Sequence, residues 1–265
     1  MSKLSFICIV QLLVFLYVHA FHNSLRPIKG HHSSSSQLLA TKIDEKLEIR
    51  FAENADIPRV AEFLANAMYE QNIPFGQKRK LVELEKLDLQ KTYGETMGKR
   101  KFPAALILAE IEEEFIGTVG LDCQILNVKA NKFRRIPKGW EYTDLKSTEK
   151  LGLVMANLST RIDKRKRGYA KMLIKEAEAL AKELMFEELY LLVDSENTPA
   201  QKLYEKNGFV LEFKDEDATC VASTPLSLKT QECVNFGYRK SIVAAKVTVP
   251  GGNAISSFFG GLFGK

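Results

Sequence analysis

The stretch from Asn157 to Leu173, NLSTRIDKRKRGYAKML, joins a basic loop to the start of a predicted helix. Residues 161–167 hold five cations in seven positions, and Gly168 follows them. A glycine lets the backbone approach a ligand closely. A helix N-terminus presents unpaired N–H groups and a partial positive charge, which suit phosphate. The stretch therefore predicts a phosphate- or pyrophosphate-binding loop. A solvated basic loop before a surface helix is the alternative.

Two motifs in the chain resemble signatures of one enzyme superfamily. Residues 165–170, RKRGYA, match R/Q-x-x-G-x-G/A, the coenzyme A pyrophosphate loop of the GNAT N-acetyltransferases. Residues 197–209, NTPAQKLYEKNGF, resemble that superfamily's N-x-x-A-x-x-x-Y-x-x-x-G-F signature. The resemblance extends from about Leu47 to about Tyr238, most of the chain. It implies an enzyme that uses acetyl-CoA as co-substrate and needs no metal.

The resemblance also implies where the cofactor binds. Two neighbouring strands, one carrying Leu158 and one carrying Val193, would splay apart and leave backbone groups unpaired. Acetyl-CoA would satisfy those groups by pairing its pantetheine arm with the backbone of Leu158, Ser159 and Thr160. Asn197 would bond the same arm from the end of the next strand. The loop that would hold the pyrophosphate consists of Arg165, Lys166, Arg167, Gly168, Tyr169, Ala170 and Lys171.

Tyr204 falls at the position of the superfamily's general acid, seven residues after Asn197. A phenol with a pKa near ~10 can protonate a leaving thiolate without ionising beforehand. The alternative is a core tyrosine on an amphipathic helix. No base is assigned, and Asp122, Glu141 and a chain of water molecules stay open. In the strand before the loop, some relatives carry Glu where this chain has apolar residues, Val154 and Met155.

Histidine is confined to the beginning of the chain. The four histidines are residues 19, 22, 31 and 32. If a presequence containing them is removed, the mature protein has no histidine. Ser-His-Asp, Cys-His and HExxH zinc chemistry are then excluded.

The first 42 residues have the composition of targeting segments. Residues 1–20 combine Lys3, an apolar run and a small residue at Ala20, which predicts a signal peptide. A membrane anchor is the alternative. Residues 21–42 are basic, rich in Ser and His and free of acids, as in a transit peptide. The Ala20-Phe21 junction resembles the bipartite plastid presequence of algae with complex plastids. This predicts the plastid stroma, and secretion is the competing destination.

Charge and cysteine usage restrict the classes of partner. The first 40 residues carry three cations and no acid, so the rest of the chain has a net charge of +2. Such a body does not suggest a nucleic-acid-binding protein. Cys123, Cys220 and Cys233 remain beyond the presequence, an odd count that fits reduced thiols better than a disulfide framework. Membrane contact is expected only through the presequence and, weakly, through the Phe-rich tail.

The hydrophobic periodicity predicts a mixed α/β fold whose mostly antiparallel central sheet is flanked by helices, as the resemblance also implies. The acidic triplet 112–114 predicts a hairpin turn, and 189–193 predicts a strand buried on both faces. Residues 124–150 form either a surface insertion or a substrate-gating loop, and 214–232 are expected to be irregular. The predicted strands are 47–51, 102–111, 115–123, 151–158, 189–193, 209–213 and one within 236–249, and the predicted helices are 57–68, 77–97, 170–185 and 199–207.

These observations predict a catalytic domain over residues 47–249 and a flexible tail over 250–265. The expected reaction is transfer of acetyl from acetyl-CoA to a primary amine, with protein N-termini or lysines in the plastid as first choice. Small amines such as polyamines or amino sugars are the second choice. A non-catalytic CoA-binding protein is the third reading.

Overall fold

The computed structural model describes residues 47–68, 75–94, 103–223 and 228–242. The predicted presequence, the predicted tail and the last residues of the predicted catalytic domain lie outside these ranges.

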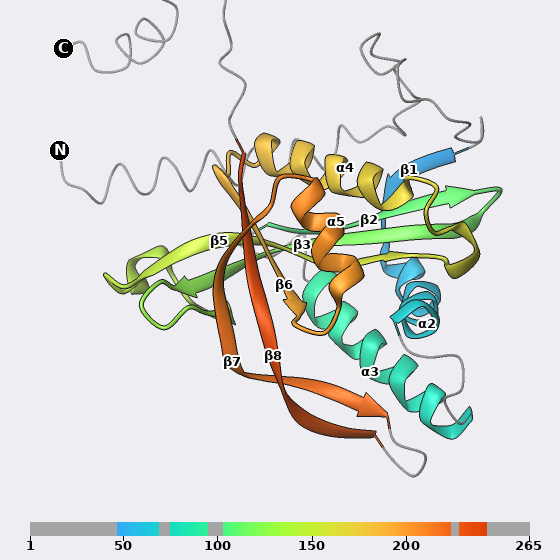
Figure 1. The fold of residues 1–265 in the computed structure, drawn as a ribbon, viewed down its shortest axis with the longest axis horizontal. Coiled ribbons are helices and arrows are strands. Elements are labelled where there is room, and N and C mark those ends of the chain that lie inside the picture. Colours follow the sequence, from blue (N-terminus) through green and yellow to red (C-terminus); the bar gives the residue numbers. More distant parts are fainter. Residues whose placement is uncertain (1–46, 69–74, 95–102, 224–227, 243–265) are drawn as a thin grey trace, which may run out of the picture.

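The described residues build one eight-stranded sheet with the order β1-β2-β3-β5-β6-β8-β7, and β4 pairs with β3 (Figure 1). Only the β5–β6 pair is parallel, and the other pairs are antiparallel. The expected mixed, mostly antiparallel sheet is therefore confirmed. The strands are β1 (Leu47–Phe51), β2 (Ala104–Ile111), β3 (Glu114–Asn127), β4 (Lys132–Arg135), β5 (Glu149–Thr160), β6 (Glu188–Asp194), β7 (Val210–Ser223) and β8 (Leu228–Ser241).

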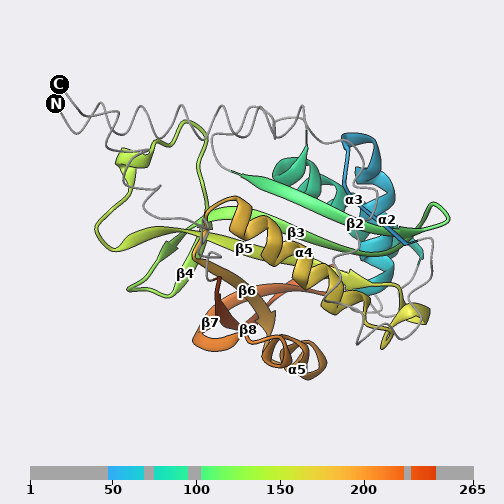
Figure 2. The same cartoon turned by 90° about the horizontal axis from the view of Figure 1, so that it is seen from above.

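Helices cover both faces of the sheet. In Figure 1, α4 (Tyr169–Glu183) lies above the sheet, and α2 (Ile57–Met68) and α3 (Phe75–Tyr93) lie below it. The short helix α5 (Thr198–Lys206) shares the buried cluster of α4, because Tyr204 packs in it with Leu173 and Ala177. Figure 2 views the molecule from the α4 side. We call the two sides of the sheet the α4/α5 face and the α2/α3 face.

Successive side chains along a strand lie on opposite faces of the sheet, so each residue can be assigned to one of the two faces. On β5, Leu153 and Met155 belong to the cluster under α4, whereas Val154 between them packs with Tyr190 of β6. Opposite Val154 on β3 stands Asp122, which places this carboxylate on the α2/α3 face.

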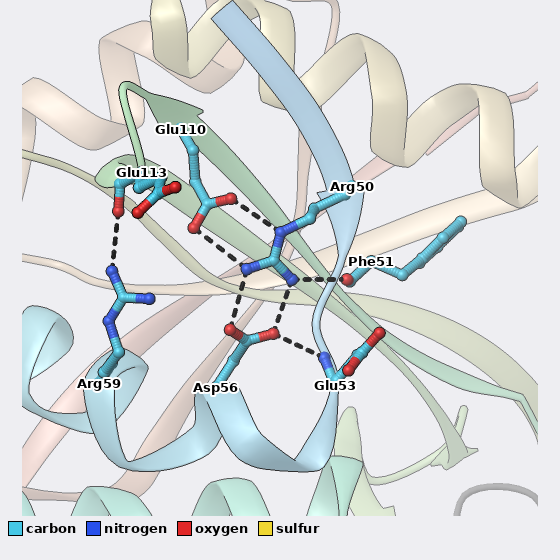
Figure 3. Close-up of polar contacts among 7 residues, drawn as sticks. All are labelled: Arg50, Phe51, Glu53, Asp56, Arg59, Glu110 and Glu113. Atoms are coloured by element: carbon cyan, nitrogen blue, oxygen red, sulfur yellow. Dashed lines mark hydrogen bonds and ion pairs between the residues drawn. The ribbon is translucent and has the colours of Figure 1, made fainter. Parts of the chain in front are cut away.

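A partly buried ion network joins β1, β2 and the turn before α2. Figure 3 shows the Arg50 guanidinium between the carboxylates of Glu110 and Asp56. Arg50 Nε donates to Glu110 Oε2 at 2.7 Å and Nη1 donates to Asp56 Oδ2 at 2.6 Å. Asp56 also accepts from the Glu53 backbone N–H at 2.8 Å, which closes the 3-10 turn η1 (Asn54–Asp56). The network fixes the start of α2 to the first two strands.

Two expectations were wrong. Residues 214–232 are not irregular, because 210–223 and 228–241 form the long β7–β8 hairpin, and its last strand begins before residue 236. The hairpin satisfies its backbone groups by pairing the two strands, so it needs no continuous apolar pattern. The strand 189–193 is not buried on both faces, since Leu192 is 36% exposed. The stretch 124–150 contains β4, and its role as an insertion or a gating loop stays a prediction.

Candidate active site

Strands β5 and β6 separate in the middle of the sheet. Their parallel pairing covers three residue pairs and ends at Met155 and Leu191. Beyond that point β5 still pairs with β3 as far as Thr160, and β6 still pairs with β8 as far as Asp194. The divergence that the motif resemblance implied is therefore present. It leaves the β6 side of residues 156–160, which include Leu158, Ser159 and Thr160, without a strand partner.

A β-bulge lies at the point of divergence. The β3–β5 register shifts between Thr118 and Gly120, and Asn157 on β5 has φ = +55°. The Thr118 hydroxyl donates to the Asn157 carbonyl oxygen at 3.3 Å. A bulge bends its strand and increases its twist, which turns β5 away from β6. Sequence reasoning missed this residue. The available signal was an Asn, which tolerates a left-handed conformation, inside an apolar strand.

The loop after β5 leads directly into α4. Lys166 has φ = +62°, and Gly168, the N-cap of α4, has φ = +93°. Lys166, Arg167 and Gly168 are exposed, and a Cβ placed on Gly168 would meet no atom within 4 Å. With glycine as N-cap, no side chain covers the first N–H groups of the helix, which include Ala170 and Lys171. The loop is thus open to an anion.

The side chains of this loop divide into two groups. Arg165 Nη2 donates to the Ala67 carbonyl at 2.7 Å and its Nε donates to the Thr160 carbonyl at 3.4 Å. Its guanidinium therefore fastens the loop to the end of α2. The Tyr169 ring is buried, so only its backbone faces the loop. Lys166 and Arg167 remain the exposed cations beside Gly168.

Tyr204 is a residue of α5, and its side chain lies in the core. Its side chain is 8% exposed and packs against Phe209 and Tyr238, with ring centroids 5.9 and 6.4 Å away. Burial raises the pKa of Tyr204 to about 12. The phenol therefore keeps its proton throughout the neutral range, as a general acid must. The same packing also fits the alternative role, in which Tyr204 is a core tyrosine on an amphipathic helix.

Asn197 caps the helix that carries Tyr204. Its Oδ1 accepts from the Ala200 backbone N–H at 3.2 Å, and Pro199 stands in the first turn. Asn197 is exposed, and because the cap uses the amide oxygen, its Nδ2 group can donate to a ligand. Asn197 follows the end of β6, beyond the point where β5 has diverged.

The two carboxylates considered as bases occupy different environments. Asp122 is 4% exposed on the α2/α3 face of β3 and accepts from Gln124 Nε2 at 3.2 Å. Glu141 is exposed and forms the capping box of the 3-10 turn η3 (Tyr142–Asp144). Asp122 stands opposite Val154, one residue before the last β5–β6 pair. The structure therefore brings Asp122, and not Glu141, close to the divergence of the strands.

The family model described as the acetyltransferase (GNAT) family matches residues 67–209 of this chain. The chain belongs to this family. Both sequence motifs, residues 165–170 and 197–209, fall inside the matched range.

Several solved acetyltransferases resemble this one. PaiA N-acetyltransferase of Thermoplasma acidophilum, crystallised with coenzyme A, is 18% identical with a TM-score of 0.48, covering 74% of this chain and 98% of its own. NAA60 of Arabidopsis thaliana, in complex with a bisubstrate analogue, is 17% identical with a TM-score of 0.47, covering 75% and 99%. Spermidine/spermine N-acetyltransferase SpeG of Vibrio cholerae is 19% identical with a TM-score of 0.45, covering 74% and 92%. No curated protein matches the acetyltransferase.

Two features are absent from the described part of the acetyltransferase. Its described residues contain no group of three or more His, Cys, Asp or Glu side chains placed to hold a metal ion. Among the same residues, no helix has the length and apolar character that a membrane crossing requires.

Proposed function

We propose that this acetyltransferase moves acetyl from acetyl-CoA to a primary amine of a protein, either an N-terminus or a lysine. One observation carries the proposal: β5 and β6 diverge immediately before a helix whose glycine-capped N-terminus is open. The divergence offers unpaired backbone to an extended arm, and the helix N-terminus offers N–H groups to a pyrophosphate. Coenzyme A combines an amide-containing arm with a pyrophosphate, so the two features fit the two parts of one molecule.

The residues present fit acetyl-CoA, whose thioester supplies the acetyl group. The backbone of Leu158, Ser159 and Thr160 would pair with the arm, and Asn197 Nδ2 would donate to it. Backbone N–H groups between Lys166 and Lys171 would hold the pyrophosphate, and the Lys166 and Arg167 side chains would add positive charge. The Arg165 side chain instead keeps the loop in place.

Proton transfer can be assigned to residues on both sides of the sheet. The acceptor must lose a proton before its nitrogen attacks the acetyl carbon, and in this proposal Asp122 would receive that proton, directly or through water. The nitrogen then forms its bond to the acetyl carbon and releases its second proton to solvent. The carbon–sulfur bond breaks, and Tyr204 would donate its proton to the departing sulfur. Both groups regain their starting state by exchange with solvent.

The protein acceptor rests on the predicted plastid presequence, because plastid-targeted members of the family acetylate protein N-termini and lysines. Polyamines and amino sugars remain the alternative acceptors. A fluorescent fusion of residues 1–45 should enter plastids in an algal host. Export of the fusion to the medium would contradict the proposed localisation.

The decisive experiment uses the acetyltransferase trimmed to begin at Thr41. Acetyl-CoA is titrated by calorimetry, and thiol release is then followed with N-terminal peptides, lysine peptides and small amines. Binding with peptide-dependent release would support the proposal and would identify the modified amine. Thiol release with small amines only would mean that the acceptor is a small amine and not a protein. Binding without any release would favour a CoA-binding protein, and no binding would reject the assigned loop.

A further inference from the structure

The bulge in β5 places two residues of this strand opposite one residue of β3. The regular pairs on either side of the bulge are Thr118–Ser159 and Gly120–Ala156. Between them, Val119 alone stands opposite Asn157 and Leu158. The extra residue shifts the alternation of β5 by one position, so that Leu158 packs against the buried cluster under α4, to which Val119 belongs. The bulge therefore decides which way the backbone of residues 158–160 is turned, at the point where β5 has left β6.

Asn157 gives the bulge its backbone conformation. Its φ of +55° lies in the left-handed region, which Asn tolerates and β-branched residues avoid. In one common type of bulge a glycine occupies this region at the first position, and Asn157 takes that place here. Because a bulge removes its extra residue from the regular ladder, the backbone groups of that residue need partners elsewhere.

Thr118 supplies such a partner. It is fully buried, and its hydroxyl donates to the Asn157 carbonyl oxygen at 3.3 Å. A threonine hydroxyl has one proton to donate, so this bond uses it. The bond ties the bulged residue to β3, and Figure 2 shows that β5 lies between β3 and β6. Thr118 therefore holds β5 from the side that is turned away from the gap between β5 and β6.

The β3 strand is itself fixed beside the bulge. Tyr93, the last residue of α3, is 2% exposed, and a Cβ built on Gly120 would come within 2.7 Å of Tyr93 Cζ. The ring thus rests directly on β3 from the α2/α3 face. On the opposite face Val119 and Leu121 are fully buried in the cluster under α4. Since β3 is packed on both faces, the irregularity falls on β5, and the Thr118 hydroxyl acts from a fixed strand.

We propose that Thr118 is a positioning residue for coenzyme A: its hydroxyl holds the Asn157 carbonyl and thereby keeps the backbone of residues 158–160 turned toward the gap. This inference rests on the proposed function, because it takes the gap between β5 and β6 as the place of the pantetheine arm. Thr118 lies on the other side of β5 from this gap, so it acts through Asn157 and does not contact the cofactor.

The test uses the full chain and separates the hydroxyl of Thr118 from its shape. Thr118→Val keeps the shape and removes the hydroxyl, whereas Thr118→Ser keeps the hydroxyl and removes a methyl group. We expect Thr118→Val to raise the Kd for acetyl-CoA, measured by calorimetry, by roughly tenfold, equivalent to about 1.4 kcal/mol. Thr118→Ser should stay within about threefold of the wild type. Equal Kd values for the three proteins, or a larger rise for Thr118→Ser than for Thr118→Val, would overturn the inference.

Thr92 provides a matched control for the loss of a buried hydroxyl. It lies on α3 and is 5% exposed, and its hydroxyl has no hydrogen-bond partner within the described part of the chain. Thr92→Val therefore makes the same chemical change without removing a hydrogen bond. Its Kd for acetyl-CoA should stay within about twofold of the wild type. A rise as large as that of Thr118→Val would show that the effect does not come from the bulge, and would contradict the inference.

A pair of substitutions at Asn157 covers the case in which Thr118→Val does not fold. Glycine adopts a positive φ readily, whereas a β-branched valine is strained there. Asn157→Gly should therefore bind acetyl-CoA roughly tenfold more tightly than Asn157→Val. Equal affinities of the two variants would mean that binding does not depend on the bulge.

Steady-state kinetics distinguish a failure of this inference from a failure of the proposed function. In Thr118→Val the KM for acetyl-CoA should rise, while the KM for the acceptor stays within about twofold, because a general loosening of the fold would raise both. A wild type that does not bind acetyl-CoA would reject the proposed function and this inference with it. A wild type that binds and turns over, beside a Thr118→Val variant with unchanged Kd and KM, would reject the inference alone.

Discussion

Tyr204 is buried, and the proposed mechanism requires its phenol to carry a proton. A phenol whose pKa is about 12 stays protonated at neutral pH, and a departing thiolate gains from a proton donor beside it. We expect Tyr204→Phe to lower kcat by about 100-fold or more, within the usual range for a general acid, and to leave the Kd for acetyl-CoA nearly unchanged. Steady-state kinetics and calorimetry provide the two numbers. Tyr238→Phe is a matched control, because Tyr238 is buried in the same cluster. An undiminished kcat in Tyr204→Phe would remove this residue from the mechanism.

The same burial predicts a dependence of stability on pH. The pKa of Tyr204 is about 12 in the folded protein and ~10 in the unfolded chain, because the core disfavours the phenolate. Folding is therefore favoured by this group below pH ~10, and that contribution is lost as the pH rises toward 12. The loss amounts to about 3 kcal/mol. Urea unfolding should show a smaller fall in stability between pH 9 and 11 for Tyr204→Phe than for the wild type. Parallel curves for the two proteins would mean that the phenol is not desolvated.

Gly168 has a backbone conformation that favours glycine, and it lies where the proposed function expects the pyrophosphate. Its φ of +93° disfavours any side chain, and the space beside it is open. Gly168→Glu places a carboxylate where the pyrophosphate is expected, so the Kd for acetyl-CoA should rise by roughly 100-fold, or about 2.8 kcal/mol. Gly139→Glu is the matched control, since Gly139 has φ = +80° and open space but lies within residues 124–150 and not in the loop before α4. Equal Kd values for the two variants would place the pyrophosphate elsewhere.

At the scale of elements, Arg50 holds the first strand, the second strand and α2 together. Hydrogen bonds with Asp56 and Glu110 raise the pKa of Arg50, and Arg50 in turn holds the pKa of Asp56 below its usual value. Arg50→Met would leave two buried carboxylates without their cation, which costs about 3–5 kcal/mol. Denaturant unfolding at pH 7 measures this loss. The contribution of Asp56 is present above its usual pKa and is lost as the pH falls through its lowered folded value. A loss below about 1 kcal/mol would show that the network is no stronger than an exposed pair.

The elements that the sequence predicted well are those with strong local signals. The apolar stripe of α4 and the Gly168 N-cap follow from periodicity and turn chemistry, and the neighbouring, diverging strands β5 and β6 follow from the resemblance that the two motifs carry. The β7–β8 hairpin could not be found in the same way. Its strands are stabilised by pairing with each other, and residues 214–217, KDED, resemble a loop in composition.

Other features depend on contacts between distant parts of the chain. The exposure of Leu192 follows from the divergence of β5, which no spacing along β6 reveals. The hydrogen bond from Arg165 to Ala67 spans 98 positions, and the Lys132–Asp217 pair spans 85. The motif identified Arg165 as part of the loop, but only the fold shows that its guanidinium supports the loop.

In the proposed function, the layers of the whole molecule separate donor from acceptor. Residues 165–171 and Tyr204 belong to the α4/α5 face, and Asp122 belongs to the α2/α3 face, with the diverging strands between them. If these residues have the proposed roles, both substrates would be bound at once and transfer would need no acetylated side chain. The nearest thiol to Asp122 along the chain, Cys123, is 3% exposed, and burial together with the Asp122 charge raises its pKa to about 12. Such a thiol stays protonated and is a poor nucleophile at neutral pH.

This arrangement predicts a sequential mechanism. Double-reciprocal plots of rate against acetyl-CoA at several acceptor concentrations should intersect, whereas a covalent acetyl-enzyme would give parallel lines. Intact mass measured after incubation with acetyl-CoA alone should show no added acetyl group. Cys123→Ala should keep kcat within about threefold of the wild type, since its volume change affects packing and not the chemistry. Parallel lines together with an acetylated wild type and an unacetylated Cys123→Ala would instead establish transfer through this thiol. Both substrates would then have to reach the reacting carbon in turn, and the separation of faces would not explain the reaction.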